Sequence, residues 1–309
     1  MKFSVDESPC EKSVDEGNLN DEVHRNWLDA KKLFIALNRR YRHKVKPMPT
    51  IIVGFKCVDG VVIASDSQSE FGRGVDVKRL NANKIYTIDG RYIIAGSGIL
   101  AHIQVLVENV EFCLRNREGQ QRSELNKDEA EKMAEEALWS LVRHYNVDRS
   151  NLLGLPEREY FQPIAIFVGR SKENNVEYYV YFLHGYDGTI EPVTDYGAAG
   201  SGAAYAELLL KSLYYENITV EEAIKVAIYV VGEVKAIDPH CGGDTQVAIL
   251  TADTSSQRDT RLRMLSESEI ESAEKDVKPK LDLLRTALVR KILRGEVDEN
   301  KIREITGSA

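Results

Sequence analysis

Six residues that could take part in polar chemistry stand at the ends of predicted strands and helices. They are, in chain order, Thr50, Asp66, Lys84, Gly96, Ser201 and Asp238. The set supplies hydroxyls, carboxylates, one ammonium and a glycine amide. A threonine or serine hydroxyl is too weakly acidic to attack an amide at neutral pH unless a base lies beside it. The spacing therefore raises the question of whether these residues meet.

Each of these residues also has an ordinary structural explanation. Asp66 and Lys84 could form a strand-end surface ion pair, worth about 0–1 kcal/mol. Ser201 could cap a helix, and Asp238 could be the acid of a turn before Pro239. The glycine-rich sequences at 95–98 and 198–202 could serve close packing where a strand meets a helix. The residue types alone leave both interpretations open.

Common catalytic and metal-binding motifs are absent from the sequence. It contains no GxxxxGK[ST] phosphate loop, no HExxH and no GxSxG. The six histidines show no ligand spacing, and the four cysteines form no CxxC pair. We therefore expect no metal, no cofactor and no disulfide framework.

Two β-hairpins are predicted directly after residue 49. The sequence TIIVGFKCVDGVVIASDSQ, over 50–68, has two β-branched runs joined by an Asp-Gly turn, which is a strong hairpin signal. KIYTIDGRYIIA, over 84–95, repeats that pattern. The hairpins place four strands within about fifty residues.

The later elements come in blocks. Apolar periodicity predicts helices over 100–113 and 128–145, strands over 163–168, 177–183 and 189–197, a helix over 203–215 and a strand over 246–251. Thr219 and Glu222 form a capping box that opens one further helix. This order does not alternate as a doubly wound sheet requires, and it predicts an α+β sandwich of two antiparallel sheets covered by helix pairs.

Three regions follow from the charge and the periodicity. Residues 1–49 switch from an acidic stretch to a basic one, contain an amphipathic helical pattern over 20–42, and end at Pro47 and Pro49. Residues 50–255 hold the predicted sheets. Residues 256–309 are charged and predict a tail of one or two helices.

Composition limits the partners. A net charge of −8 gives little support for a nucleic-acid role, which needs a basic face. The sequence has no apolar run of the ~18 to 20 residues that a membrane span requires. Its first residues are acidic and lack the apolar stretch of a secretory signal, so we expect a cytoplasmic protein.

Five segments between Thr50 and Ala252, two thirds of the chain, form an ordered pattern. They are TIIVGF..DGVVIASDSQ, NKIYTID, IIAGSG, AAGSGAAYAE and AIDPHCGGDTQVAIL. This pattern resembles the proteasome β-type family of amino-terminal-nucleophile hydrolases. The first hairpin is also similar to the peptidase subunit of the bacterial two-component ATP-dependent protease, with Gln68 where most proteasome β chains carry Arg.

The resemblance implies a fold and an activity. It implies a four-layer αββα fold, homo- or hetero-oligomeric rings and threonine-dependent hydrolysis of polypeptides, with a regulatory ATPase as a further partner. Thr50 matches the nucleophile, and its own α-amine, with an unperturbed pKa near ~7.7 to 8.0, matches the base. The amine is free only if residues 1–49 are removed as a propeptide.

The same resemblance gives roles to the other residues. Lys84 matches the lysine beside the hydroxyl, and Asp66 matches the carboxylate that pairs with it. Gly96 matches the residue whose backbone amide stabilises the oxyanion. Ser201 and Asp238 match the residues that hold the amine.

Three departures from the family pattern are visible. Pro49 precedes Thr50 where self-cleaving members usually have Gly, and a rigid proline constrains the geometry of attack on its carbonyl. Cys241 stands where the family has a serine, so a weak hydrogen-bond donor replaces a good one. Two extra residues after Asp66 leave Lys78 as an alternative to Lys84, and the NKIYTID match favours Lys84.

Two other functions remain open. The chain could be a non-catalytic structural subunit of a proteasome-like ring that keeps its amino-terminal extension. It could also act on other amides or in peptide ligation, since specificity depends on pocket residues near 98–102.

Overall fold

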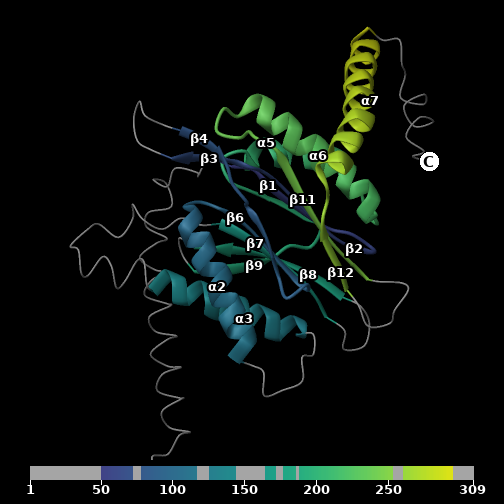
Figure 1. Ribbon diagram of the computed structural model, residues 1–309. Helices are drawn as coiled ribbons and strands as arrows, with labels where there is room; N and C mark the ends of the chain where they lie inside the picture. The colour runs from purple at the N-terminus through teal and green to yellow at the C-terminus, as the bar shows by residue number, and fades with distance from the viewer. Residues whose placement is uncertain are drawn as a thin grey trace, which may run out of the picture. The chain divides into compact units, whose positions relative to one another are not determined.

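The computed structural model describes residues 50–71, 78–116, 125–143, 164–171, 177–185, 188–252 and 260–294. The amphipathic helix predicted over 20–42, and the whole segment 1–49, lie outside these residues. Within them the chain forms two five-stranded antiparallel sheets, one two-stranded sheet and five helices (Figure 1).

The first sheet has the spatial order β10-β1-β2-β11-β12. Its strands are β1 (Ile52–Lys56), β2 (Gly60–Asp66), β10 (Tyr196–Ala199), β11 (Thr245–Ala252) and β12 (Thr260–Met264). The predicted hairpin between β1 and β2 is confirmed, and its turn is closed by a bond from Cys57 N to the Gly60 carbonyl at 2.8 Å. Pairing continues past the strand, because Asp66 N donates to the Ile51 carbonyl at 3.2 Å. The hairpin thus brings Asp66 beside the start of the chain's first strand.

The second sheet has the order β5-β6-β7-β8-β9. Its strands are β5 (Ile85–Ile88), β6 (Tyr92–Ser97), β7 (Ile164–Ser171), β8 (Glu177–His184) and β9 (Thr189–Pro192). The predicted β5–β6 hairpin is also confirmed. Asp89 and Gly90 both have positive φ, 49° and 65°, and Arg91 N donates to the Ile88 carbonyl at 3.0 Å. Both features are typical of a type I′ turn, and residues 89–91 separate the paired ends Ile88 and Tyr92.

Helix pairs cover the outer faces of the two sheets, which confirms the four-layer αββα architecture (Figure 1). α2 (Leu100–Asn116) and α3 (Lys127–Val142) contact the second sheet, and α5 (Ala203–Leu213) and α6 (Val220–Ile237) contact the first. The capping box predicted at Thr219 and Glu222 is present at the start of α6. No helix among these described segments is both long enough and apolar enough to cross a bilayer.

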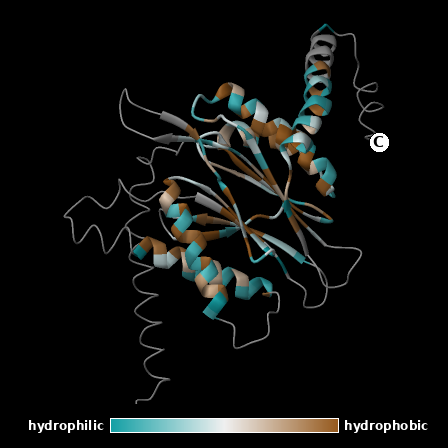
Figure 2. Cartoon of the chain, viewed as in Figure 1, coloured by the Kyte–Doolittle hydropathy of each residue, from teal (hydrophilic) through white to brown (hydrophobic). Residues whose placement is uncertain are grey.

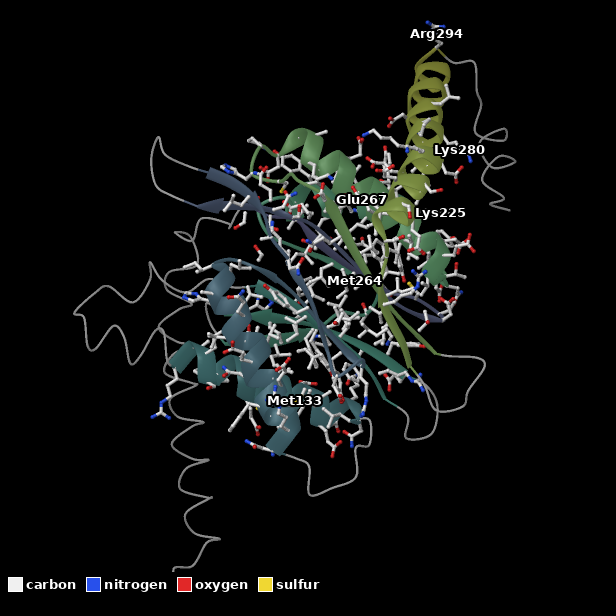
Figure 3. All side chains as sticks on the ribbon, viewed as in Figure 1. Met133, Lys225, Met264, Glu267, Lys280 and Arg294 are labelled. Carbon is white, nitrogen blue, oxygen red and sulfur yellow. The ribbon has the colours of Figure 1, made fainter. Side chains whose placement is uncertain are left out.

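Buried apolar residues pack between the two sheets and beneath α5 and α6, and hydrophobic positions recur along the strands and helices (Figure 2). On β1, Ile52 joins the core between the sheets, whereas Val53 joins the core beneath α5 and α6. Every residue of β2 is buried. Burial on both faces favours apolar residues, which explains the apolar run VVIA within β2. Met133 of α3 is likewise fully buried (Figure 3).

The strand predicted over 189–197 is wrong as a single element. β9 pairs with β8 in the second sheet, and β10 pairs with β1 in the first. The chain crosses between the sheets at 193–195, where Val193 N donates to the Val180 carbonyl at 2.8 Å and Lys56 N donates to the Asp195 carbonyl at 2.7 Å. Apolar alternation shows which residues are buried, but it does not show which sheet they join.

Three strands were not predicted. β3 (Gln68–Phe71) and β4 (Lys78–Asn81) form the two-stranded sheet, and β12 forms an edge of the first sheet. Neither QSEF nor KRLN is a β-branched run, so both lacked the pattern used to identify strands.

In the described part of the carboxyl-terminal region, residues 260–294, one helix follows β12: α7 (Glu267–Leu293). Its first turn is capped by Ser266, whose amide donates to Glu269 Oε2 at 2.8 Å. It contacts α6, where Lys278 Nζ lies 3.2 Å from Glu233 Oε1. Glu267 and Lys280 are exposed (Figure 3). Pro279 lies inside the helix, so one intrahelical hydrogen bond is missing there.

Candidate active site

The hydroxyl of Thr50 lies in a buried polar cluster. Thr50 precedes β1 and is 1% exposed. Its Oγ1 donates to Asp66 Oδ1 at 2.6 Å and accepts a short hydrogen bond from Lys84 Nζ. A hydroxyl has one proton and two lone pairs, so these two partners use its donor and one of its acceptor sites.

Asp66 fixes the cluster. It ends β2, is 0% exposed, and its Oδ1 accepts from Lys84 Nζ at 2.7 Å as well as from Ile51 N at 3.0 Å. Its Oδ2 accepts from Gly242 N at 3.0 Å. Two charge-assisted hydrogen bonds, from the backbone amides of Ile51 and Gly242, therefore hold the carboxylate in place. These two residues are far apart in the sequence. The amides of Ile51 and Gly242 were not among the predicted site groups.

Lys84 immediately precedes β5 and is 6% exposed. Burial lowers the pKa of its ammonium, and the charge and hydrogen bond of Asp66 oppose that effect. The structure thus brings Lys84 to Thr50, whereas the side chain of Lys78 lies outside the described residues. The surface ion pair considered for Asp66 and Lys84 is excluded, because both side chains are buried.

The nitrogen of Thr50 belongs to a second network. It donates to Ser201 Oγ at 3.2 Å, and Ser201 Oγ donates to Asp238 Oδ2 at 2.7 Å. Gly200 has φ of 99°, and a Cβ there would lie 2.3 Å from the Thr50 carbonyl oxygen. Only glycine allows this approach. The helix cap of α5 is Gly202 and has no side-chain cap bond, so Ser201 does not serve as the cap.

Asp238 is both a turn residue and a network residue. Its Oδ1 accepts from His240 N at 3.0 Å at the end of α6. Burial raises the pKa of Asp238, but the hydrogen bonds from Ser201, His240 and Cys241 outweigh burial and leave the pKa below its ordinary value. The carboxylate therefore stays ionised beside Ser201.

Cys241 lies at the edge of this network. Its Sγ is 3.5 Å from Asp238 Oδ2 and 3.7 Å from Ser201 Oγ. Burial, reinforced by the charge of Asp66, raises the pKa of the thiol to about 12. Cys241 therefore remains a neutral, weak donor at neutral pH.

Gly96 is placed by packing and by a backbone bond. Its amide donates to the Lys84 carbonyl at 2.9 Å, and a Cβ at this position would lie 2.4 Å from Ile103 of α2. The close-packing explanation of this glycine therefore holds. The oxyanion role stays a prediction, and it requires the amide to be shared with Lys84 or released from it.

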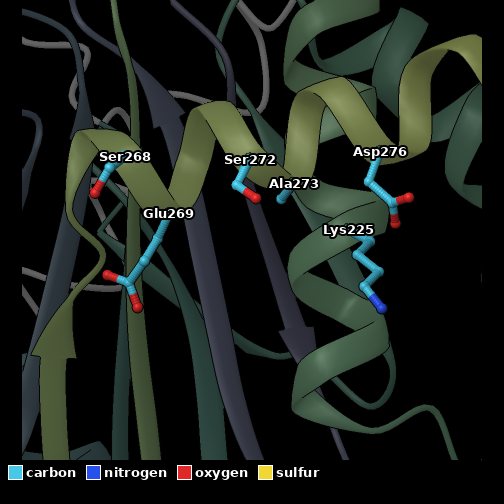
Figure 4. Close-up of a pocket in the computed structure, with 6 residues that line it drawn as sticks. All are labelled: Lys225, Ser268, Glu269, Ser272, Ala273 and Asp276. Atoms are coloured by element: carbon cyan, nitrogen blue, oxygen red, sulfur yellow. The ribbon is translucent and has the colours of Figure 1, made fainter.

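A separate groove is lined by residues of α6 and α7, and Thr50 is not among them (Figure 4). Its volume is about 440 Å³, and it is lined by Lys225, Ser268, Glu269, Ser272, Ala273 and Asp276. Lys225 pairs with Glu221 at 3.0 Å. The lysine, acidic and serine side chains of this groove do not form a buried cluster of hydroxyl, carboxylate and ammonium like the one around Thr50.

Comparison with known proteins agrees with this geometry. The family described as "Proteasome subunit" matches residues 48–150 and 166–250. A "Proteasome subunit beta" of Nanoarchaeum equitans is 34% identical over 58% of this chain and 81% of its own length. "Proteasome subunit beta 2" of Caldivirga maquilingensis is 28% identical over 64% of this chain and 88% of its own, and the Pyrococcus furiosus protein of that name is 29% identical over 68% and 91%. The chain belongs to the proteasome subunit family, and within it to the β type.

Proposed function

We propose that this chain is a threonine-type peptidase in which Thr50 is the nucleophile once residues 1–49 have been released. The observation that carries the proposal is the buried contact of Thr50 Oγ1 with both Asp66 and Lys84. These groups come from separate elements, so chain neighbourhood does not explain their meeting. A buried ammonium beside a hydroxyl favours the alkoxide that forms when the hydroxyl loses its proton.

The freed α-amine of Thr50 is the proposed base. In the reaction, Oγ1 attacks the carbonyl carbon of a peptide bond while the amine accepts the hydroxyl proton. The amine then passes that proton to the leaving nitrogen as the C–N bond breaks, which leaves an ester on Thr50. Water hydrolyses this ester by the same proton transfers in reverse order. Ser201 and Asp238 would hold the amine, as they now hold the Thr50 amide.

The backbone amide of residue 50 cannot serve as this base while it is acylated. Its lone pair is delocalised into the carbonyl of Pro49. In the uncut chain the buried hydroxyl already contacts Asp66 and Lys84 but lacks the base, so it is inactive. We further propose that the substrate is polypeptide and that the subunit works in a ring, with a regulatory ATPase as a partner.

Two measurements test this proposal. Intact mass and amino-terminal sequencing of the assembled protein should show a chain that starts at Thr50. An epoxyketone or β-lactone should add one adduct to that residue, and Thr50→Ala should abolish both the adduct and peptide turnover. A mature Thr50 chain that neither reacts nor turns over peptides would refute the proposal.

A second candidate is a non-catalytic ring subunit that retains its extension. Pro49 favours it, because a rigid proline constrains the attack that self-cleavage requires. Under this alternative the purified ring contains an uncut chain and forms no adduct.

A further inference from the structure

The segment that carries Lys84 makes only some of the backbone hydrogen bonds of a strand. Residues 82–84 lie between β4 and β5 and belong to neither. Ala82 N donates to the Ser67 carbonyl at 2.8 Å, and the Lys84 carbonyl accepts from Gly96 N at 2.9 Å. This leaves the Ala82 carbonyl and the Lys84 amide to be satisfied by something other than a neighbouring strand.

The side chain of Gln246 satisfies both groups. Its Oε1 accepts from Lys84 N at 3.0 Å, and its Nε2 donates to the Ala82 carbonyl at 2.9 Å. A carboxamide has a donor and an acceptor like a peptide group, so this side chain takes the place of the absent strand. A leucine offers neither group, and an ionised glutamate offers only the acceptor.

Gln246 also belongs to the framework that positions Asp66. It lies on β11 opposite Ser65 of β2, and the adjacent pair in the same ladder is Thr245 opposite Asp66. The carboxylate is therefore set by β2, and the backbone of Lys84 is tied to the strand beside β2. The Gln246 side chain thus connects the sheet that carries Asp66 to the segment that carries Lys84.

We propose that Gln246 is a positioning residue that holds the backbone of Lys84 at the distance its ammonium needs to reach Thr50. The role rests on the proposed function, because Lys84 matters only if Thr50 reacts. Gln246 acts through the main chain and has no bond to Thr50 or Asp66 among the described contacts. A displacement of about 1 Å at a reacting centre can lower a rate about 100-fold.

The test compares Gln246→Leu with wild type in the assembled ring. We expect kcat on a fluorogenic peptide, and the rate of β-lactone addition, to fall by about 10- to 100-fold with KM changed less than about twofold. Deuterium uptake by the peptide spanning 82–88 should become faster. Asn126→Ala is the matched control, because the Asn126 side chain also accepts a hydrogen bond from a backbone amide, that of Glu129. This bond lies at the start of α3 and not in the segment that carries Lys84. The control variant should leave kcat and uptake at 82–88 unchanged.

Gln246→Glu adds a readout that loss of stability alone does not give. A protonated carboxyl can donate to the Ala82 carbonyl and accept from Lys84 N, whereas the ionised form cannot donate. Its activity relative to wild type should therefore rise as the pH falls from about 6 to about 4, the range in which an ordinary glutamate, with a pKa of about 4.3, takes up its proton. The corresponding ratio for Gln246→Leu should stay flat.

The two proposals can fail separately. A mature wild-type ring that forms no adduct refutes the proposed function. A reactive wild type whose kcat, adduct rate and uptake at 82–88 are matched by Gln246→Leu refutes the positioning role.

Discussion

Lys84 Nζ lies 2.7 Å from Asp66 Oδ1, and the two side chains are only 7% and 0% exposed. Neither charge can be solvated by water if the other is removed. The same Asp66 oxygen accepts a hydrogen bond from the Thr50 hydroxyl at 2.6 Å. The two charges that compensate each other in this buried site therefore belong to the residues proposed to activate the nucleophile.

Lys84→Met should destabilise the protein by about 3–5 kcal/mol, because it leaves the Asp66 carboxylate buried without a cation. Asp66→Asn should cost a comparable amount by leaving the ammonium uncompensated. The double variant Asp66→Asn/Lys84→Met removes both charges and should cost clearly less than the sum of the single changes. All three should lack turnover. Urea unfolding measures the energies, and strictly additive losses would contradict a coupled pair.

Activity should decline on the alkaline side at a lower pH than an ordinary lysine would give. Burial lowers the pKa of Lys84 below the unperturbed value of about 10.4, so its ammonium is lost earlier as the pH rises. Because the proposed mechanism needs the charged form, kcat/KM should fall in that window. A profile that stays level up to about pH 10.4 would contradict this assignment.

The stability linked to Lys84 should change in the opposite direction in the same window. While the lysine is charged, its burial costs free energy. The unfolded chain binds more protons between the folded and the unfolded pKa, so the free energy of unfolding rises with pH there. Urea unfolding of wild type relative to Lys84→Met, at the pH values of the kinetic profile, should show this rise.

The fold was largely predictable because its strong local patterns agree with its long-range packing. The Asp-Gly dipeptides at 59–60 and 89–90 both lie where a hairpin forms, and the Thr219 capping box begins α6 as expected. The division of 189–197 between two sheets was not predictable. Thr189 lies in β9, which pairs with β8, and Tyr196 lies in β10, which pairs with β1. The choice of partner strand depends on tertiary packing, and the alternation of apolar and polar residues in the sequence does not show it.

The side chains proposed to react were predictable, and the groups that hold them in place were not. Thr50, Asp66 and Lys84 stand at strand ends in a family pattern, and the structure brings them together. The Gly242 amide and the Gln246 carboxamide reach the site from residues more than 160 positions away in sequence. Every residue except proline has a backbone amide, so a sequence does not show that one glycine amide binds a carboxylate. A glutamine in a predicted β-strand likewise looks like an ordinary polar residue.

Ser201→Ala should reduce turnover much more than Cys241→Ala. Ser201 links the Thr50 nitrogen to the ionised Asp238, and a hydrogen bond to a charged group is worth about 1.5–3 kcal/mol, or about 10- to 100-fold in rate. The thiol of Cys241 is a weak donor at 3.5 Å from Asp238, so its loss should change kcat/KM less than about threefold. Steady-state kinetics on mature rings compares the two.

A control for that comparison uses the chemistry of the thiol. With a pKa of about 12 and little exposure, Cys241 should resist iodoacetamide at neutral pH until the protein unfolds. Equal losses in Ser201→Ala and Cys241→Ala would show that the network does not separate the two residues as described.

Gly96→Ala should destabilise the protein by about 1–3 kcal/mol, because the added methyl group would meet Ile103 at 2.4 Å. Ile103→Ala alone should also be destabilising, because it leaves a cavity in the core. The double variant should recover part of the combined loss, since the new methyl group occupies space that the isoleucine vacates. The double variant retains the backbone amide of residue 96. Recovery of both stability and turnover would therefore support this amide as the oxyanion donor. Recovered stability without turnover would indicate that glycine is needed there for the substrate's approach.

Pro49→Gly should speed the appearance of a chain that starts at Thr50 if the protein cleaves itself. Self-cleavage requires Oγ1 of Thr50 to attack the carbonyl carbon of residue 49, which exchanges the peptide bond for an ester that water then hydrolyses. Proline fixes φ near −65° and restricts the approach of that carbonyl, whereas glycine does not. Intact mass over time measures the release of residues 1–49. The control is Thr50→Ala in the Pro49→Gly background, which lacks the attacking hydroxyl and should remain uncut. Release at the same rate in that control would assign the cleavage to a separate protease, and the role of Thr50 would then rest on peptide turnover and adduct formation alone.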